Sequence, residues 1–295
     1  MVADALWRAV AEGRLDVALQ GKVSLKDGMP AGFEALVRWP DSRTDAGRPV
    51  GPDEFVPVAE EAGLAPAIDM LVLRKVCSAM AAMLAEPAGA RLAKAVGKGI
   101  VAVNVSAATL SDSGWAERFL EVPKAYGFDP SLLQVEVTET AVVRDPEAAR
   151  ANLAAVHAAG AGVALDDFGV GHSGLRRLKE LPIDEVKVDR SFLAGVARPC
   201  AWVGSCSACI GRGLGDPCEK AYGLLEWIVG VGKVAGGIRV VVEGVEDEWQ
   251  ADAVRAMGAD VGQGWRWSRP AAPDAAFAEA VARMEAALTS SSAAR

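Results

Sequence analysis

Polar and ionisable side chains interrupt the short apolar segments of this sequence in a recurring way. Seven such segments carry a carboxylate, an amide or a lysine inside them or at their end, and one ends in two adjacent aspartates. These eight groups are Glu34, Asn104, Glu136, Asp166, Asp167, Lys187, Glu243 and Gln263. Burying any one of them without a partner would cost free energy. We therefore expect the eight side chains to lie together.

The residue types indicate which chemistry such a cluster could perform. Carboxylate and amide oxygens suit Mg²⁺ or Mn²⁺ better than zinc. Asp166 and Asp167 would repel each other at a strand end unless cations lie between them, so one of the two could bridge two metal ions. Lys187 beside such ions is a candidate for positioning or deprotonating a water molecule.

Each position taken singly has a simpler structural explanation. A glutamate in a strand usually faces solvent, an aspartate at a strand end usually caps a helix, and a lone lysine extends its amine to the surface. These explanations do not account for the joint placement of the groups on seven segments.

Short β-rich segments alternate along the chain with longer helical patterns. The eight candidate strands are residues 16–22, 33–39, 100–105, 132–137, 162–165, 185–188, 238–242 and 259–262. Strands mostly separated by helices are typical of parallel βαβ units. Eight units suggest an α/β fold, a closed TIM-type (β/α)8 barrel, in which the carboxyl ends of all strands meet at one rim. An open doubly wound sheet is the alternative, weakened by the lack of a GxGxxG or Walker sequence.

Two helices carry clear start signals. Asp145 is placed to cap a helix with Pro146 at its first position, and Gly160 ends that helix. Asp274 is placed to cap the last helix, whose apolar positions step by three or four residues as far as Leu288. The helical patterns between the strands thus support the barrel prediction.

Length and composition restrict the class of protein. The chain has 295 residues, of which 51% are hydrophobic, and this excludes wholesale disorder. No linker-like boundary divides it, so we expect one domain over residues 1–288 and a disordered tail over residues 289–295. The net charge of −8 argues against binding a DNA or RNA polymer or an anionic membrane. A small anionic ligand stays possible, because bound metal ions can invert the local charge.

Neither a signal peptide nor a membrane span is expected. Asp4 and Arg8 interrupt the N-terminal segment where a signal peptide would need an apolar run. The most apolar region, residues 224–242, contains three charged residues and four glycines. We therefore expect a cytoplasmic protein.

Seven motifs occur in an order and spacing that resemble the EAL-domain phosphodiesterases. They are GFEALVRW, VAVNVS, EVTET, ALDDFGVGHSGL, IDEVKVDRSF, VVEGVE and GADVGQGWRWSRP. The similarity extends over residues 5–285. It implies a metal-dependent hydrolase that converts the bacterial second messenger cyclic di-GMP to linear pGpG, and it implies a homodimer.

The resemblance also implies a role for each group. Two ions, Mg²⁺ or Mn²⁺, would be held by Glu34, Asn104, Glu136, Asp166 and Asp167, with Asp166 contacting both. Lys187 would orient or activate the attacking water, and Glu243 and Gln263 would complete the metal and water network. Glu139 would anchor the loop of residues 168–175. Gln20 and Arg38 would contact the ligand, Arg38 through a phosphate.

An alternative within the same family is a catalytically silent domain that acts as a cyclic di-GMP receptor or a protein-interaction module. Silent members typically lack a metal ligand or the lysine. Every one of these residues is present in this chain, which favours the enzyme.

Four of the five cysteines fall within 19 residues. They are Cys200, Cys206, Cys209 and Cys218, whereas Cys77 lies alone in a helical pattern and is expected in the core. The interval between Lys187 and Glu243 is longer than in the family, which places a Cys-rich insertion at about residues 197–219, after the sixth strand. In a cytoplasmic protein such a cluster favours a Zn²⁺ or Fe–S site, with two disulfides or free thiols as alternatives.

Overall fold

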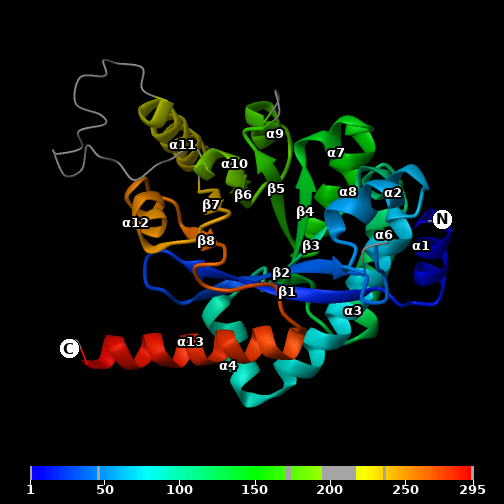
Figure 1. Ribbon diagram of the computed structural model, residues 1–295, viewed down its shortest axis with the longest axis horizontal. Coiled ribbons are helices and arrows are strands. Elements are labelled where there is room, and N and C mark those ends of the chain that lie inside the picture. Colours follow the sequence, from blue (N-terminus) through cyan, green and yellow to red (C-terminus); the bar gives the residue numbers. More distant parts are fainter. Residues whose placement is uncertain (1, 45–46, 171–173, 195–216, 235–236, 294–295) are drawn as a thin grey trace.

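Eight strands form a closed barrel in sequence order (Figure 1). The structure is a computed structural model that describes residues 2–44, 47–170, 174–194, 217–234 and 237–293. The strands are β1 (Asp16–Ser24), β2 (Pro30–Arg38), β3 (Val101–Asn104), β4 (Leu133–Thr138), β5 (Gly162–Phe168), β6 (Glu185–Val188), β7 (Arg239–Val242) and β8 (Val261–Gln263). The predicted TIM-type barrel is confirmed.

Strand β1 departs from the parallel pattern that the sequence favoured. It pairs antiparallel with both β2 and β8, whereas the pairs from β2–β3 to β7–β8 are parallel. Only residues 25–29 join β1 to β2. A segment this short can close a hairpin but cannot hold the crossover helix that parallel strands require. As a consequence β1 runs from the rim downward, with Gln20 level with Glu34 and Lys22 below it.

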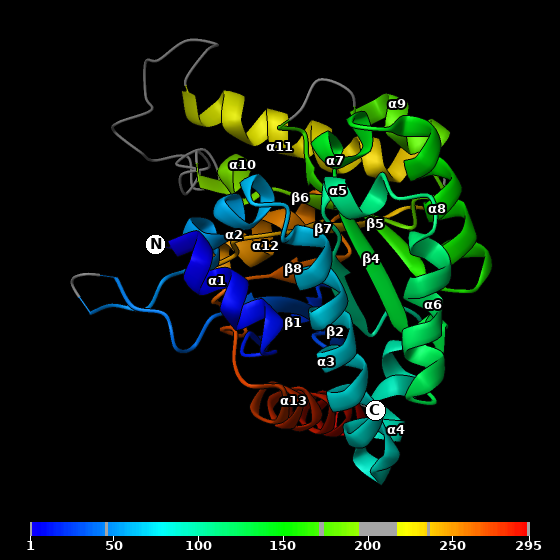
Figure 2. The same ribbon diagram turned by 90° about the vertical axis from the view of Figure 1, so that its right-hand side faces the viewer.

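Helices cover the outside of the barrel, with α3, α6 and α8 along one side (Figure 2) and α13 packed against β1, α3 and α4. The helices are α1 (Val2–Ala11), α2 (Pro52–Glu61), α3 (Ala65–Ala85), α4 (Pro87–Val96), α5 (Ala107–Leu110), α6 (Trp115–Ala125), η1 (Pro130–Leu132), α7 (Glu139–Val143), α8 (Pro146–Ala158), α9 (Gly174–Glu180), α10 (Arg190–Ala194), α11 (Pro217–Val234), α12 (Glu248–Ala256) and α13 (Pro273–Ala293). The predicted cap of α8 is confirmed, since the Asp145 carboxylate accepts a hydrogen bond from Ala148 N at 3.0 Å.

The last helix is longer than the sequence indicated. Helix α13 continues to Ala293, into the residues for which the sequence favours a disordered tail. The Thr289 hydroxyl donates to the Glu285 carbonyl oxygen at 2.8 Å, one turn earlier in the same helix. The residues after it are serines and alanines, which do not break a helix.

The strands divide their side chains between two environments. Apolar residues at alternating positions, such as Leu133, Val135 and Val137 of β4, belong to the hydrophobic core between strands and helices. Gln134 and Glu136 alternate with them and are equally buried. Strand alternation therefore directs the polar set to the barrel interior.

Three observations complete the outline. Cys77 is fully buried in α3, as predicted. Residues 200, 206 and 209 of the cysteine cluster lie outside the described residues, and Cys218 is described only as part of the α11 backbone.

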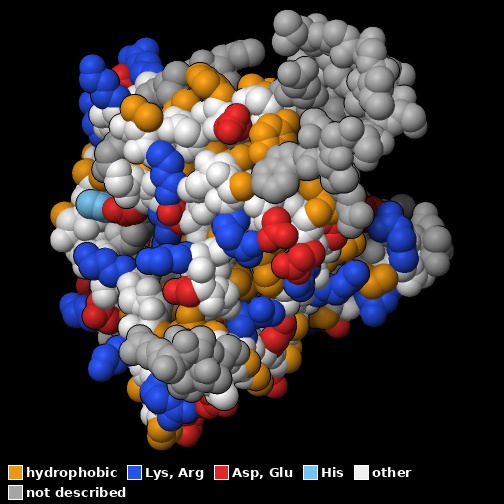
Figure 3. Space-filling view, turned by 90° about the vertical axis from the view of Figure 1, so that its left-hand side faces the viewer, with side chains coloured by type: hydrophobic (Ala, Val, Ile, Leu, Met, Phe, Trp, Pro, Cys, Tyr) orange, Lys and Arg blue, Asp and Glu red, His pale blue; other side chains and the backbone are white. Residues whose placement is uncertain are grey.

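None of the described helices is long and apolar enough to cross a membrane. On the face seen in Figure 3, acidic and basic side chains are interspersed among those drawn in colour.

Candidate active site

Four carboxylates converge on the ammonium group of Lys187 inside the barrel. The Lys187 side chain on β6 is 1% exposed, and its Nζ lies 2.9 Å from Glu136 Oε2, 3.2 Å from Asp166 Oδ2 and 3.4 Å from Glu34 Oε2. The fourth carboxylate is that of Glu243, directly after β7, with Oε1 2.7 Å from the same nitrogen. Strands β2, β4 and β5 each contribute one of these acids, and the fourth follows the end of β7. The structure thus brings together five of the eight side chains that the sequence singled out.

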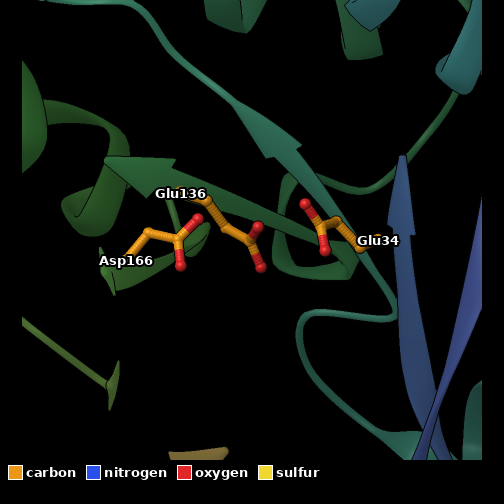
Figure 4. A group of neighbouring side chains, drawn as sticks. All are labelled: Glu34, Glu136 and Asp166. Atoms are coloured by element: carbon orange, nitrogen blue, oxygen red, sulfur yellow. The ribbon is translucent and has the colours of Figure 1, made fainter. Parts of the chain in front are cut away.

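Three of these acids form a group that could hold a cation (Figure 4). Glu34, Glu136 and Asp166 each offer a carboxylate oxygen, and these three atoms lie within 4.8 Å of one another. Hard divalent ions such as Mg²⁺ prefer such oxygen ligands. The donor set therefore fits the ion that the sequence predicted.

Two amides orient Glu34 in this group. Asn104 Nδ2 donates to Glu34 Oε1 at 3.0 Å, and Gln263 Nε2 donates to Glu34 Oε2 at 2.7 Å and to Gln20 Oε1 at 3.3 Å. Gln20 in turn donates to the Ser268 carbonyl oxygen at 3.1 Å. The carbonyl oxygen Gln263 Oε1 is buried and has no hydrogen-bond partner among the described residues. A buried acceptor of this kind is suited to a bound water or ion.

Burial and the two lysines give the acids different pKa values. Burial raises the pKa of Glu136 to about 7 and that of Glu243 to about 8, although Lys187 acts against both shifts. Burial also acts to raise the pKa of Glu34, but Lys187, Lys22 and the two amide hydrogen bonds outweigh it and lower the pKa to about 2. The pKa of Lys187 itself lies well above its usual value, because the carboxylates outweigh its burial. Lys187 is therefore an ammonium donor in this arrangement.

The Asp166–Asp167 pair sits on an irregular part of β5. The pairing of β5 with β6 shifts register between Leu165 and Phe168. Asp167 has a φ of +53°, and its N–H donates to Asp166 Oδ1 at 2.9 Å. Such a bulge re-aims neighbouring side chains. Asp166 points to Lys187, whereas Asp167 lies outside the group of three, and burial together with Asp166 and Asp189 raises its pKa.

Two further predicted residues border the site. Glu139, the first residue of α7, accepts a hydrogen bond from Gly169 N at 3.3 Å, so it contacts the loop that follows the two aspartates. Arg38 at the end of β2 is half-buried, and burial lowers its pKa. Its guanidinium donates to the Val37 carbonyl oxygen at 2.9 Å. Arg38 and Asn104 both line a cavity of about 510 Å³.

Sequence reasoning missed a second set of buried charges below this site. Lys22 on β1 lies with its Nζ 2.7 Å from Glu136 Oε1 and 3.2 Å from Glu185 Oε1. Arg239 Nε lies 2.6 Å from Glu185 Oε2. The alternation of side chains along a strand could have identified two of these charged residues from the sequence. Lys22 and Glu185 each stand two positions from a predicted residue, Gln20 and Lys187 respectively, and so face the same side of their strands.

Comparison with known proteins gives the family. A model of the EAL domain matches residues 3–210. A cyclic di-GMP phosphodiesterase of Pseudomonas aeruginosa is 32% identical over 255 residues, which cover 86% of this chain and 38% of that protein. The chain spans between 29% and 38% of the length of the first eight curated relatives.

Solved structures agree with this result. The phosphodiesterase PaMucR in complex with c-di-GMP is similar with a TM-score of 0.76 and 29% identity, over 93% of this chain and 98% of that one. The EAL enzyme Bd1971, bound to cAMP and cyclic di-GMP, has the same fold with a TM-score of 0.78 and 22% identity, over 94% and 67% of the two chains. On the domain match and the identity to these relatives, this chain belongs to the EAL domain family.

Proposed function

We propose that this protein hydrolyses cyclic di-GMP to linear pGpG with the help of divalent ions, Mg²⁺ or Mn²⁺. The observation that carries the proposal is the placement of Lys187 among Glu34, Glu136, Asp166 and Glu243 at one end of the barrel. The cyclic di-GMP activity named for the relatives supports the choice of substrate.

The residues that would hold the ions are those that the family resemblance implies, and the group of three acids supports one of the two sites. Glu34, Glu136 and Asp166 would share one ion with the carbonyl oxygen of Asn104, and Asp166 with Asp167 would hold the second. When bound, these ions would polarise the phosphodiester and lower the pKa of a water molecule.

The chain's own residues supply orientation and charge. Lys187, held as an ammonium ion by its carboxylate neighbours, would donate hydrogen bonds to a water or to a phosphate oxygen rather than remove a proton. Arg38 would bind a phosphate in the neighbouring cavity, because its two-pronged guanidinium matches two oxygens. Gln263 would fix the position of Glu34, and Gln20, which accepts a hydrogen bond from the same amide, would contact the ligand.

A chromatographic assay tests the proposal. The protein is incubated with cyclic di-GMP and Mg²⁺ or Mn²⁺, and pGpG is quantified. We expect pGpG from the natural sequence and none from Glu34→Ala, which removes an acid of the group of three. If the natural sequence and Glu34→Ala both give no pGpG while calorimetry still detects ligand binding, the protein is a cyclic di-GMP receptor and the proposal is wrong.

We also propose that residues 1–288 act as one domain in a cytoplasmic homodimer. The domain and the dimer rest on the family resemblance. Light scattering of the whole chain in solution would give the mass directly, and a monomeric mass would contradict the dimer.

A further inference from the structure

Lys22 is a buried lysine that the proposed reaction does not use. Its side chain is 3% exposed on β1. The ammonium nitrogen lies 2.7 Å from Glu136 Oε1, 3.2 Å from Glu185 Oε1 and 3.4 Å from Gln134 Oε1. Strand β1 is not a neighbour of β4 or β6 in the sheet, so these contacts cross the barrel interior.

The two oxygens of Glu136 are divided between two lysines. Oε1 accepts from Lys22, and Oε2 accepts from Lys187 at 2.9 Å. Because each lysine holds a different oxygen, the plane of the carboxylate cannot turn without breaking one of the ion pairs. Glu136 thus has one oxygen held by Lys22 and one available on the side of Glu34 and Asp166.

Lys22 is itself held in place. Glu185 Oε1 contacts Lys22, and its other oxygen, Oε2, lies 2.6 Å from Arg239 Nε. Glu185 is 1% exposed and Arg239 is 33% exposed at the start of β7. A chain of charges therefore runs from Glu136 through Lys22 and Glu185 to an arginine that reaches solvent.

We propose that Lys22 is a positioning residue for Glu136, which keeps Oε1 turned away so that Oε2 is the oxygen offered to a divalent ion at Glu34, Glu136 and Asp166. The inference rests on the proposed function only in that an ion binds there. Partners that orient metal-binding side chains commonly change metal affinity when they are removed.

A positioning role and a purely electrostatic role predict opposite results. Lys22 is a cation near the proposed ion, so its charge alone would weaken metal binding, and removing it would tighten binding. If Lys22 positions Glu136, its removal leaves Oε1 without a partner and exposes Glu136 to repulsion from Glu185. Metal binding then becomes weaker.

Mn²⁺ titration followed by electron paramagnetic resonance separates these roles without any substrate. We expect Lys22→Met to raise the Kd for Mn²⁺ about 10- to 100-fold. The matched control is Lys75→Met, which removes a surface lysine 3.6 Å from Asp16 and should leave the Kd unchanged. Tighter Mn²⁺ binding by Lys22→Met, or a Kd equal to that of the natural sequence, would overturn the proposal.

A second variant guards against loss of the fold. Glu185→Gln removes the negative charge that pairs with Lys22 and Arg239 but keeps Lys22 on Glu136, so its Kd should stay close to that of the natural sequence. The double variant Lys22→Met with Glu185→Gln removes one charge of each sign and is expected to fold. We expect it to bind Mn²⁺ more weakly than Glu185→Gln alone. Equal Kd values for these two variants would contradict a direct action of Lys22 on Glu136.

Hydrolysis measured on the same preparations separates this inference from the proposed function. If the natural sequence binds Mn²⁺ but forms no pGpG, and Lys22→Met weakens the binding, the proposed function is wrong and the role of Lys22 stands. If the natural sequence forms pGpG and Lys22→Met binds Mn²⁺ unchanged, only the role of Lys22 is wrong.

Discussion

Lys187 on β6 and Glu243, the residue that follows the neighbouring strand β7, form an ion pair in which Nζ of the lysine lies 2.7 Å from Oε1 of the glutamate. This pair fixes the ammonium group at the point where the carboxylates of Glu34, Glu136 and Asp166 also meet. One ammonium group therefore contacts all four acids, and Lys22 contacts one of them, Glu136, from its other oxygen. The chemistry of the site depends on how that balance changes when a divalent ion or a substrate enters.

Replacing Lys187 tests its part in the reaction. We expect Lys187→Met to lower the rate of pGpG formation by about 10²- to 10⁴-fold, the range typical of a positioned proton-transfer or charge-stabilising group. Binding of cyclic di-GMP should persist, because Arg38 and the cavity beside it are unchanged. Chromatography measures the rate and calorimetry the affinity.

The control for this variant is Lys233→Met, which removes a lysine paired with Asp260 near the surface. It should leave the rate unchanged. A Lys187→Met protein that hydrolyses cyclic di-GMP at the natural rate would show that the ammonium group has no part in the chemistry.

Mn²⁺ affinity should depend on pH in the neutral range. Burial raises the pKa of Glu136 to about 7, so below that pH the metal-free protein carries a proton that the ion must displace. We expect weaker Mn²⁺ binding at pH 6 than at pH 8, with proton release at the lower pH. Calorimetry in buffers of different ionisation enthalpy measures both, and a Kd that is constant over this range would contradict the raised pKa.

Exchanging the ion tests the geometry of the oxygen ligands. Ca²⁺ takes six to eight ligands at longer distances than the octahedral Mg²⁺, so it should bind the carboxylates but misplace the reacting groups. We expect Ca²⁺ to abolish pGpG formation in the presence of Mg²⁺ while cyclic di-GMP still binds. Full activity with Ca²⁺ as the sole divalent ion would be the contrary result.

Gly262 on β8 allows Trp267 to approach the strand next to Gln263. A Cβ at this position would overlap the Trp267 ring. We expect Gly262→Ala to lower the free energy of unfolding by about 1–3 kcal/mol, as overpacked sites do. Chemical denaturation followed by circular dichroism measures it.

The matched change Gly230→Ala should act in the opposite direction. Gly230 lies within α11, and beyond the backbone of that helix no atom of the described residues lies within 4 Å of the position of its Cβ. Alanine there should stabilise the helix by about 0.5–1 kcal/mol. If both variants are destabilised equally, the contact with Trp267 is not the cause of the effect at Gly262.

Much of the architecture could be predicted from local patterns. The eight strands lie within a few residues of the predicted ranges, and Asp145 caps its helix as expected. Residues such as Glu34, Glu136 and Lys187 stand inside strongly apolar strands, and parallel strands bring such positions to one rim. Helix α13 continues past Leu288, where we expected a tail, because serine and alanine give no definite signal for the end of a helix.

The sequence by itself determined the strands, their order and the set of acids, amides and lysine that face the barrel interior. It could do so because strand alternation and helix caps are properties of neighbouring residues. Only the tertiary structure decided that β1 runs against its neighbours and that Lys22 meets Glu136, 114 positions further along the chain. Closure of the barrel places β1, β4 and β6 around one axis. Side-chain contacts across that axis join residues far apart in the sequence, so local sequence patterns do not predict them.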